Sequence, residues 1–541
     1  MDLLELTTRP ARRAAIEARS FAALVRAGAF GLDPPRRQVQ ILRALRDYGP
    51  LGAAPRIAAL RHPELPAIAD ERGTMSFAEL DEQVDRLANA LKGRRLAAGS
   101  SVGILCRNHR SPLIAAFAAS RAGINAIWLN TAFSARQAAE VAAREGVDLL
   151  VFDEGLSDAA ADIEARHGRI ACAADAAGEV DRAIAEGDKT PLPRPARPGR
   201  VVLLTSGTTG TPKGAPRPEP RSLSLPGALL DRMPMRAREA TVIGPPLYHG
   251  TGLIMALLSI SLGSQIVLRT SFDPATLLAD TERHRATTWC VVPIMLQRLL
   301  ALGEEELSRH DLASLRVVFC AGSQLPADVA IRAMDLLGDV VYNLYGSTEV
   351  SVATLATPQD IRAAPASVGR PALGSRVLIL DEPGEQVPAG TPGRIFVGST
   401  APFEGYTGGG SKETVGGLMS TGDVGHFDDQ GRLHIDGRDD EMIVSGGENV
   451  FPGEVEELLV THPAILEAAA IGVEDAEFGQ RLIAFVVTRD DFELGEADVK
   501  AFVKENLARY KVPREVVFLD ELPRNPTGKV LKGELAARPP K

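Results

Sequence analysis

A stretch of glycines and small hydroxylated residues, ending in a lysine and a glycine, follows a short apolar run. It reads TSGTTGTPKG over residues 205–214, directly after VVLL at 201–204. Glycines let backbone N–H groups approach phosphate oxygens, the hydroxyl groups add donors, and Lys213 supplies positive charge. The stretch is not a Walker A loop, because Gly214 rather than serine or threonine follows the lysine. A plain flexible turn is the alternative, but the density of hydroxyl groups favours a phosphate-binding loop.

Further motifs follow along the chain, and each places polar groups among glycines or prolines. They are YGSTE (345–349), STGD (420–423), GRDD (437–440), SGGEN (445–449), P-x-E (452–454) and PRNPTGK (523–529). A polar residue in any one of these loops would most often be a solvated turn residue. Taken together in this order and spacing, they resemble the adenylate-forming superfamily, which includes acyl-CoA synthetases, luciferases and non-ribosomal peptide adenylation domains. The resemblance covers residues 70–535.

The resemblance implies an acyl-CoA synthetase that activates a carboxylic acid with ATP and passes the acyl group from acyl-AMP to coenzyme A. The carboxylate is already ionised at neutral pH, so the first step needs no strong general base. The barrier is then electrostatic and geometric. Mg²⁺ prefers oxygen ligands. The resemblance assigns Glu349 and Thr208 to the metal and implies ATP, Mg²⁺ and coenzyme A as cofactors.

The nucleotide site implied by the resemblance is made of loops. Asp423 would accept hydrogen bonds from the ribose hydroxyls, and Arg438 would reach the ribose or the phosphates. Tyr345 would stack on adenine, and Thr348 would hydrogen-bond to the adenylate. The remaining positions assigned to the nucleotide are Thr205, Ser206, Gly207, Thr208, Thr209, Gly210, Lys213, Gly322, Ser323, Gln324, Gly346 and Ser347.

The C-terminal motifs imply a two-step enzyme with a moving domain. Lys529 would bridge the attacking carboxylate and the α-phosphate, and a long cation can enter and leave such a site. Rotation about Asp440 would then remove this lysine and bring Gly446 and Gly447 toward the pantetheine of coenzyme A. Glycine permits the close approach of a thin ligand, and the swing is a form of conformational gating.

The acyl side of the site is predicted from PLYHGTG at 246–252. This segment resembles the one beside the acyl pocket in the family, so His249 is expected to shape the acyl entrance and completes the predicted catalytic set with Lys529, Thr208 and Glu349. The run LIMALLSISL at 253–262 would line an apolar slot, which favours a medium- to long-chain fatty acid. Two alternatives stay open, namely a fatty acyl-AMP ligase that loads a carrier protein and a non-catalytic nucleotide-binding relative.

Alternating strands and helices must position these loops. A capping box at 76–79 starts one helix. Strands are predicted at 101–106, 125–130, 147–153, 201–207, 241–246, 265–269, 287–293, 315–322 and 340–346. Helices between strands indicate a parallel α/β sheet, whose ligands bind beyond the carboxyl ends of the strands.

The pattern changes in the last third of the chain. Short strands between Pro/Gly turns at 375–399 predict a small β-rich subdomain. The last hundred residues predict a small α+β domain, with helices near 453–460 and 496–507. We therefore expect an N-terminal adenylation domain at 1–436 and a mobile C-terminal domain at 437–541.

Composition limits the class of protein. The chain has 541 residues and a formal net charge of −10, which argues against a nucleic-acid surface. Cysteines at 106, 172, 290 and 320 lack CxxC spacing. We interpret them as small buried groups in a reducing compartment rather than zinc ligands.

Localisation and partners are predicted from the apolar and basic segments. No signal-peptide pattern or uninterrupted membrane span is present, so a cytoplasmic protein is expected. Residues 9–56 are rich in arginine and predict a solvated helical face, with peripheral contact to anionic lipid as the alternative. The pattern leaves open the acyl chain length and the oligomeric state.

Overall fold

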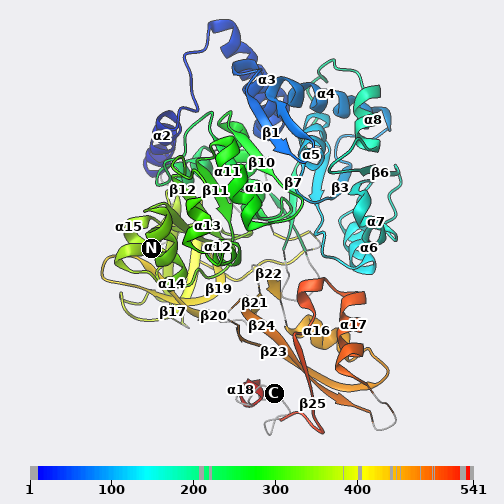
Figure 1. The fold of residues 1–541 in the computed structure, drawn as a ribbon, viewed down its shortest axis with the longest axis vertical. Coiled ribbons are helices and arrows are strands. Elements are labelled where there is room, and N and C mark those ends of the chain that lie inside the picture. The colour runs from blue at the N-terminus through cyan, green and yellow to red at the C-terminus, as the bar shows by residue number, and fades with distance from the viewer. Residues whose placement is uncertain are drawn as a thin grey trace.

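A computed structural model shows a large N-terminal part and a smaller C-terminal part (Figure 1). The structure describes residues 10–205, 213–217, 222–381, 383–399, 405–407, 409–438, 443–445, 448–450, 452–475, 477–489, 492, 494–523, 530 and 532–536. Within these residues, three sheets lie N-terminal to residue 439 and a fourth follows.

The first α/β layer is a six-stranded sheet with the order β6-β5-β3-β4-β7-β8. Its strands are β3 (Ser101–Leu105), β4 (Asn125–Trp128), β5 (Leu149–Asp153), β6 (Arg169–Cys172), β7 (Val201–Thr205) and β8 (Lys213–Arg217). All neighbours are parallel except β7 and β8. The helices of this region are α4 (Phe77–Gly93), α5 (Arg110–Ala122), α6 (Ala135–Arg144), α7 (Ser157–Ala160) and α8 (Glu179–Glu186), with the 3₁₀ turn η1 (Glu154–Leu156).

The second α/β layer is a nine-stranded sheet with the order β15-β14-β13-β12-β11-β9-β10-β1-β2. Its strands are β1 (Pro66–Asp70), β2 (Gly73–Ser76), β9 (Ala240–Ile243), β10 (Gln265–Leu268), β11 (Thr288–Val291), β12 (Val317–Ala321), β13 (Val341–Ser347), β14 (Ser351–Ala356) and β15 (Arg370–Pro371). The six strands from β1 to β13 in this order are parallel, and both edges are antiparallel. The associated helices are α9 (Ser224–Leu230), α10 (Gly250–Ser261), α11 (Pro274–His284), α12 (Pro293–Leu300), α13 (Glu304–Ser308), α14 (Ala327–Leu337) and α15 (Pro358–Ala363).

The β-rich part that follows is antiparallel. Its strands are β16 (Ser375–Leu380), β17 (Gly393–Ser399), β18 (Thr414–Val415), β19 (Leu418–Phe427) and β20 (Leu433–Arg438). The C-terminal part is a mixed sheet made of β21 (Ile443–Ser445), β22 (Glu448–Val450), β23 (Ile465–Asp475), β24 (Gly479–Thr488) and β25 (Glu515–Phe518). Its helices are α16 (Pro452–Leu459), α17 (Glu496–Asn506) and α18 (Lys532–Ala536), with the 3₁₀ turn η2 (Arg509–Lys511).

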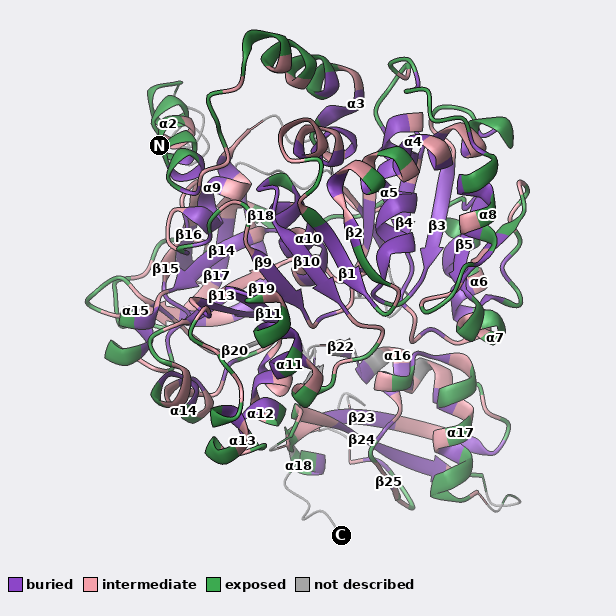
Figure 2. Cartoon of the chain, turned by 45° about the horizontal axis from the view of Figure 1, so that its top comes forward, coloured by how far each residue is buried: buried purple, intermediate pink, exposed green. Residues whose placement is uncertain are grey.

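Local sequence signals explain several of these elements. The Ser76 hydroxyl accepts the N–H of Glu79, whose carboxylate accepts the N–H of Ser76, so the predicted capping box starts α4. α5 ends at Gly123, which has φ +73° and so favours glycine. The central strands of both α/β sheets are buried under helices (Figure 2), which agrees with their continuous apolar runs.

The predicted fold class, a parallel-rich α/β layer with a β-rich subdomain and a small α+β part, is confirmed. The predicted phosphate-binding stretch continues into a further strand that begins at Lys213. Residues Lys213–Arg217 pair with β7 as the edge strand β8. An edge position tolerates Pro216, since its missing N–H costs no interior ladder bond.

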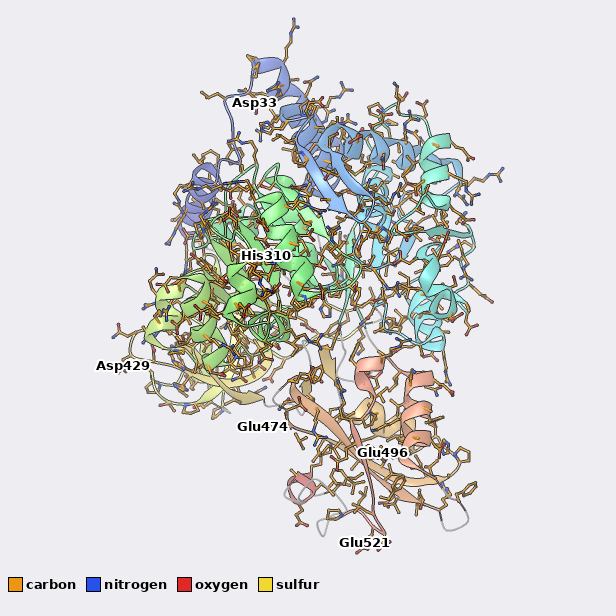
Figure 3. The ribbon with its side chains drawn as sticks, viewed as in Figure 1. Asp33, His310, Asp429, Glu474, Glu496 and Glu521 are labelled. Atoms are coloured by element: carbon orange, nitrogen blue, oxygen red, sulfur yellow. The ribbon has the colours of Figure 1, made fainter. Side chains whose placement is uncertain are left out.

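The arginine-rich N-terminal segment forms α2 (Pro10–Arg26) and α3 (Pro35–Arg61), the latter kinked at Gly49 with φ +66°. Some of its positive charge is paired, since Arg19 lies 2.7 Å from Asp231. No described helix is long and apolar enough to cross a membrane. The C-terminal part exposes acidic side chains, among them Glu474, Glu496 and Glu521 (Figure 3).

Candidate active site

The adenine-side loops that the sequence predicted begin at neighbouring strand ends. β12 and β13 are parallel, with Ala321 opposite Leu344. Gly322, Ser323 and Gln324 follow β12, and Tyr345 lies near the end of β13, so both segments lie at the carboxyl edge of one sheet. Gly322 has φ +105°, a conformation that favours glycine.

Asp423 lies on β19, in the β-rich part, and contacts the nine-stranded sheet. Its carboxylate is buried and accepts a 2.5 Å hydrogen bond from the Tyr345 hydroxyl. Arg438 is the residue opposite Asp423 on β20, described here through its backbone pairing. The fold thus brings together three residues that the resemblance assigned to the nucleoside.

Glu349 follows β13 and is held by two hydroxyl groups. Ser347 donates to Oε2 at 2.8 Å, and Tyr406 donates to Oε1 at 2.7 Å. The residue is 7% exposed, so these hydrogen bonds largely replace water around its charge. Carboxylate oxygens each have two lone pairs. The donor set fits a hard cation, although the second predicted ligand, Thr208, lies outside the described residues.

Lys213 opens β8 opposite Thr205, the last residue of β7. The residues between these strands include Ser206, Gly207, Thr208, Thr209 and Gly210, which lie outside the described part of the chain. The Lys213 ammonium lies 5.6 Å from the ring centroid of Tyr406. Tyr406 therefore contacts both the predicted phosphate-binding lysine and the predicted metal ligand Glu349.

Glu145 holds Gly214 and Thr407, which lie next to Lys213 and Tyr406 in the chain. Its carboxylate is 1% exposed and accepts hydrogen bonds from the Gly214 N–H at 3.2 Å and the Thr407 hydroxyl at 2.8 Å. The Thr407 N–H also donates to the Gly214 carbonyl at 2.8 Å. A side chain at Gly214 would place Cβ 2.4 Å from Glu145 Oε2, so the Glu145 and Thr407 side chains would have to move to admit it.

Sequence reasoning missed Glu145, Tyr406 and Thr407. Tyr406 lies between Gly405 and Thr407, and an aromatic residue in such a polar, glycine-rich stretch could have marked it as a candidate site residue. Glu145 gave no signal, because its contacts are 69 and 262 residues away.

His249 precedes α10 and meets a residue of the C-terminal part. Its Nε2 lies 3.0 Å from Oε1 of Glu448 on β22. Burial lowers the pKa of His249, but the Glu448 carboxylate raises it by more, so the net shift is upward. The side chains are 36% and 19% exposed, so water screens the pair in part. Asn108 holds the preceding segment, donating to the Pro245 carbonyl at 2.9 Å and accepting the Leu247 N–H at 2.8 Å.

Other contacts join the C-terminal part to α6 and to the segment that precedes it. The Arg509 N–H donates to the Ala132 carbonyl at 3.2 Å, and Gln137 donates to Glu454 at 3.3 Å. Tyr510 is half-buried here, and its removal from water raises its pKa. Together with the His249–Glu448 pair, these contacts bring β22 and η2 against the N-terminal part.

Four predicted residues, Asp440, Gly446, Gly447 and Lys529, lie outside the described residues. Their described neighbours are β20 to β22 and α18, the last at the end of the C-terminal part away from the N-terminal part (Figure 1).

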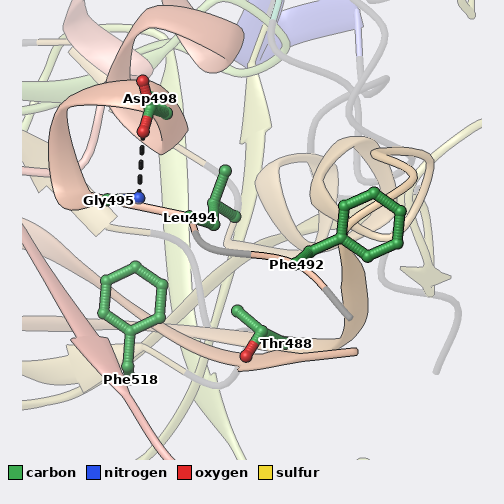
Figure 4. A pocket seen from close by; sticks show the side chains of 6 residues that line it. All are labelled: Thr488, Phe492, Leu494, Gly495, Asp498 and Phe518. Carbon is green, nitrogen blue, oxygen red and sulfur yellow. Dashed lines mark hydrogen bonds between the residues drawn. The ribbon is translucent and has the colours of Figure 1, made fainter. Parts of the chain in front are cut away.

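A shallow hollow on the C-terminal part is lined by none of the predicted site residues. It is lined by Thr488, Phe492, Leu494, Gly495, Asp498 and Phe518 (Figure 4). The Asp498 carboxylate accepts the Gly495 N–H at 2.9 Å and so caps α17. The polar contact drawn there thus serves helix capping.

Comparison with known proteins agrees with these observations. The AMP-binding enzyme family matches residues 56–407, and the AMP-binding enzyme C-terminal domain matches residues 454–529. A feruloyl-CoA synthase from Amycolatopsis sp is 32% identical over 91% of this chain and 100% of its own length. An indoleacetate–CoA ligase from Aromatoleum aromaticum is 32% identical over 90% of this chain and 95% of its own. The chain therefore belongs to the AMP-binding enzymes of the adenylate-forming superfamily. It is an enzyme, and its class is that of the acid–thiol ligases.

A solved relative shares the fold over most of this chain. The o-succinylbenzoate CoA synthetase from Bacillus subtilis, as a double mutant bound with the product analogue OSB-NCoA, matches with a TM-score of 0.78. The same synthetase with the acyl-adenylate OSB-AMP matches with a TM-score of 0.64. Both matches have 26% identity and cover 90% of this chain and 98% of the relative.

Proposed function

We propose that this enzyme activates a carboxylic acid with ATP to acyl-AMP and then transfers the acyl group to coenzyme A, releasing pyrophosphate and AMP. The observation that carries the proposal is the contact of Tyr406 with both Lys213 and Glu349, together with the hydrogen bond from Tyr345 to Asp423. One group of side chains suits phosphates and a cation, and the other suits a nucleoside.

The first half-reaction joins two anions, so its catalysis is electrostatic. Glu349, with Thr208, would hold Mg²⁺, which neutralises phosphate charge when bound. Lys213 would contact the phosphates, and Asp423 the ribose hydroxyls. Lys529 would neutralise the charge that develops between the carboxylate and the α-phosphate.

The second half-reaction is supported by the arrangement of the C-terminal part. Glu448 lies between β21 and α16, directly after the Gly446–Gly447 pair that would face pantetheine, and it contacts His249. This contact joins the predicted acyl entrance to the predicted coenzyme A side. Rotation about Asp440 would exchange this arrangement for the one that admits Lys529. We place the division between the two moving parts at residues 436 and 437.

The acid is proposed to carry an apolar acyl group with an aromatic ring. α10 presents buried Leu253, Met255 and Ala256 directly after His249, which supports an apolar slot. The two relatives named for feruloyl and indoleacetate substrates support an aromatic acid over the fatty acid that the apolar run alone suggested.

The experiment is pyrophosphate release by the full chain with ATP and Mg²⁺, across acids that include ferulate, indoleacetate, benzoate, octanoate and palmitate. The proposal expects the highest kcat/KM with an aromatic acid. A preference for octanoate or palmitate would restore the fatty-acid assignment. If no acid raises pyrophosphate release above the background measured without acid, the proposed activity is refuted.

The acceptor is tested separately. Adding coenzyme A should convert enzyme-bound acyl-AMP into acyl-CoA with release of AMP. Formation of thioester only on a phosphopantetheinylated carrier protein would identify an acyl-AMP ligase instead.

A further inference from the structure

A second group of reactive side chains lies away from the nucleotide site, in the six-stranded sheet. Cys106 follows β3, Asp153 ends β5, Cys172 ends β6, and His109 precedes α5. β3, β5 and β6 are adjacent parallel strands, so their carboxyl ends meet at one edge. All four residues are at most 4% exposed, and one ligand atom from each lies within 4.8 Å of the others.

Two separations among these atoms are close to those of a tetrahedral zinc site. Usual zinc–ligand bond lengths place two sulfurs about 3.8 Å apart, a sulfur and a carboxylate oxygen about 3.6 Å apart, and an imidazole nitrogen and that oxygen about 3.4 Å apart. The Cys106 and Cys172 sulfurs are 3.6 Å apart, and Cys172 Sγ lies 3.3 Å from Asp153 Oδ1. His109 Nε2 is 2.7 Å from the same oxygen.

The Cys172 thiol also lies within hydrogen-bond reach of Asp153 Oδ1, and the histidine–carboxylate hydrogen bond is shorter than the distance between two ligands of one metal. A movement of less than 1 Å would replace that hydrogen bond with two bonds to a metal. The ring proton would then move to Nδ1, at the cost of the 3.3 Å contact that Nδ1 accepts from the Ser111 N–H. The second carboxylate oxygen of Asp153 already accepts the Arg107 N–H at 2.8 Å, which would orient it as outer hydrogen bonds orient metal ligands.

We propose that Cys106, His109, Asp153 and Cys172 form a structural zinc site. Two sulfurs, one imidazole and one carboxylate suit Zn²⁺, and four protein ligands leave no position for substrate or water. The spacing in the sequence hides this site, because the two cysteines are 66 residues apart.

The zinc site would help to position the segment that precedes His249, at the predicted acyl entrance. Asn108 lies between the ligands Cys106 and His109 in the sequence. Its side chain hydrogen-bonds to the backbone of Pro245 and Leu247, and His249 comes two residues after Leu247. Zinc would fix the start of α5 to three strands and so keep Asn108 in position for these two hydrogen bonds. The site does not depend on the proposed reaction, so its test has no need of an active enzyme.

The test measures metal in the untagged full-length protein, expressed with added zinc and passed through a desalting column. Mass spectrometry of the metal should find about one zinc per chain. The double variant Cys106→Ser/Cys172→Ser should lose at least nine-tenths of it. The matched double variant Cys290→Ser/Cys320→Ser changes the other two buried cysteines and should retain it.

A second measurement avoids substitutions that could hinder folding. The wild-type chain, stripped by a chelator and reloaded with Co²⁺, should show thiolate-to-cobalt charge-transfer absorption and regain the Tm lost on stripping. Wild-type protein without zinc and without these bands would overturn the proposal. Equal zinc in both double variants, or a Cys106–Cys172 disulfide in the isolated protein, would also overturn it.

Discussion

Replacing Tyr406 with phenylalanine removes one hydroxyl group at the centre of the phosphate side of the site. That hydroxyl donates to Glu349 at 2.7 Å, and a hydrogen bond to a charged group contributes about 1.5–3 kcal/mol. Glu349 keeps its 2.8 Å hydrogen bond from Ser347, and phenylalanine keeps a ring face toward Lys213. We therefore take the lower end, about 1.5 kcal/mol, which is about tenfold in rate.

The assay is single-turnover pyrophosphate release without coenzyme A, measured over a series of Mg²⁺ concentrations. Tyr406→Phe should slow this step about tenfold and raise the Mg²⁺ concentration for half-maximal rate, because Glu349 is less firmly placed. Acyl transfer from preformed acyl-AMP should change by less than about threefold. Tyr342→Phe, on β13 and outside the site, is the control and should leave both steps unchanged. An unchanged rate and unchanged Mg²⁺ dependence in Tyr406→Phe would refute the reasoning.

Three other changes test separate contacts. Gly214→Ala should lower stability by about 1–3 kcal/mol through overpacking against Glu145, visible as a lower Tm; an unchanged Tm would contradict the contact. Glu448→Gln should lower the pKa of His249. The ion pair exists while His249 is protonated and is lost as pH rises through its raised pKa, so the wild-type acyl-transfer rate should fall toward alkaline pH. The variant has no ion pair to lose, so its rate should be lower at neutral pH and should not show this fall; superimposable profiles would argue against the pair. Lys529→Ala should abolish acyl-AMP formation yet spare thioester formation from added acyl-AMP, and equal loss of both steps would disprove its assigned role.

Local signals predicted much of the framework. The capping box at Ser76 and Glu79 and the apolar strands depend on residues close in sequence, so they could be predicted from the sequence alone. The sequence also predicted strands at 315–322 and 340–346 with ligands bound beyond their carboxyl ends, and β12 and β13 are parallel neighbours that share such an edge.

The missed features are contacts between distant segments. Tyr406 reaches Glu349 across 57 residues, and His249 meets Glu448 across two parts of the chain. The cysteines were interpreted one by one as small buried groups, and burial is correct for all four. Their spacing could not indicate that the folding of three strands brings Cys106 and Cys172 to one point.

The most direct measurement follows all products when the wild-type enzyme is given an aromatic acid, ATP, Mg²⁺ and coenzyme A. The account predicts acyl-CoA, AMP and pyrophosphate in equal amounts, with acyl-AMP accumulating on the enzyme when coenzyme A is withheld. Formation of ADP and phosphate, or the absence of an acyl-AMP intermediate, would contradict it.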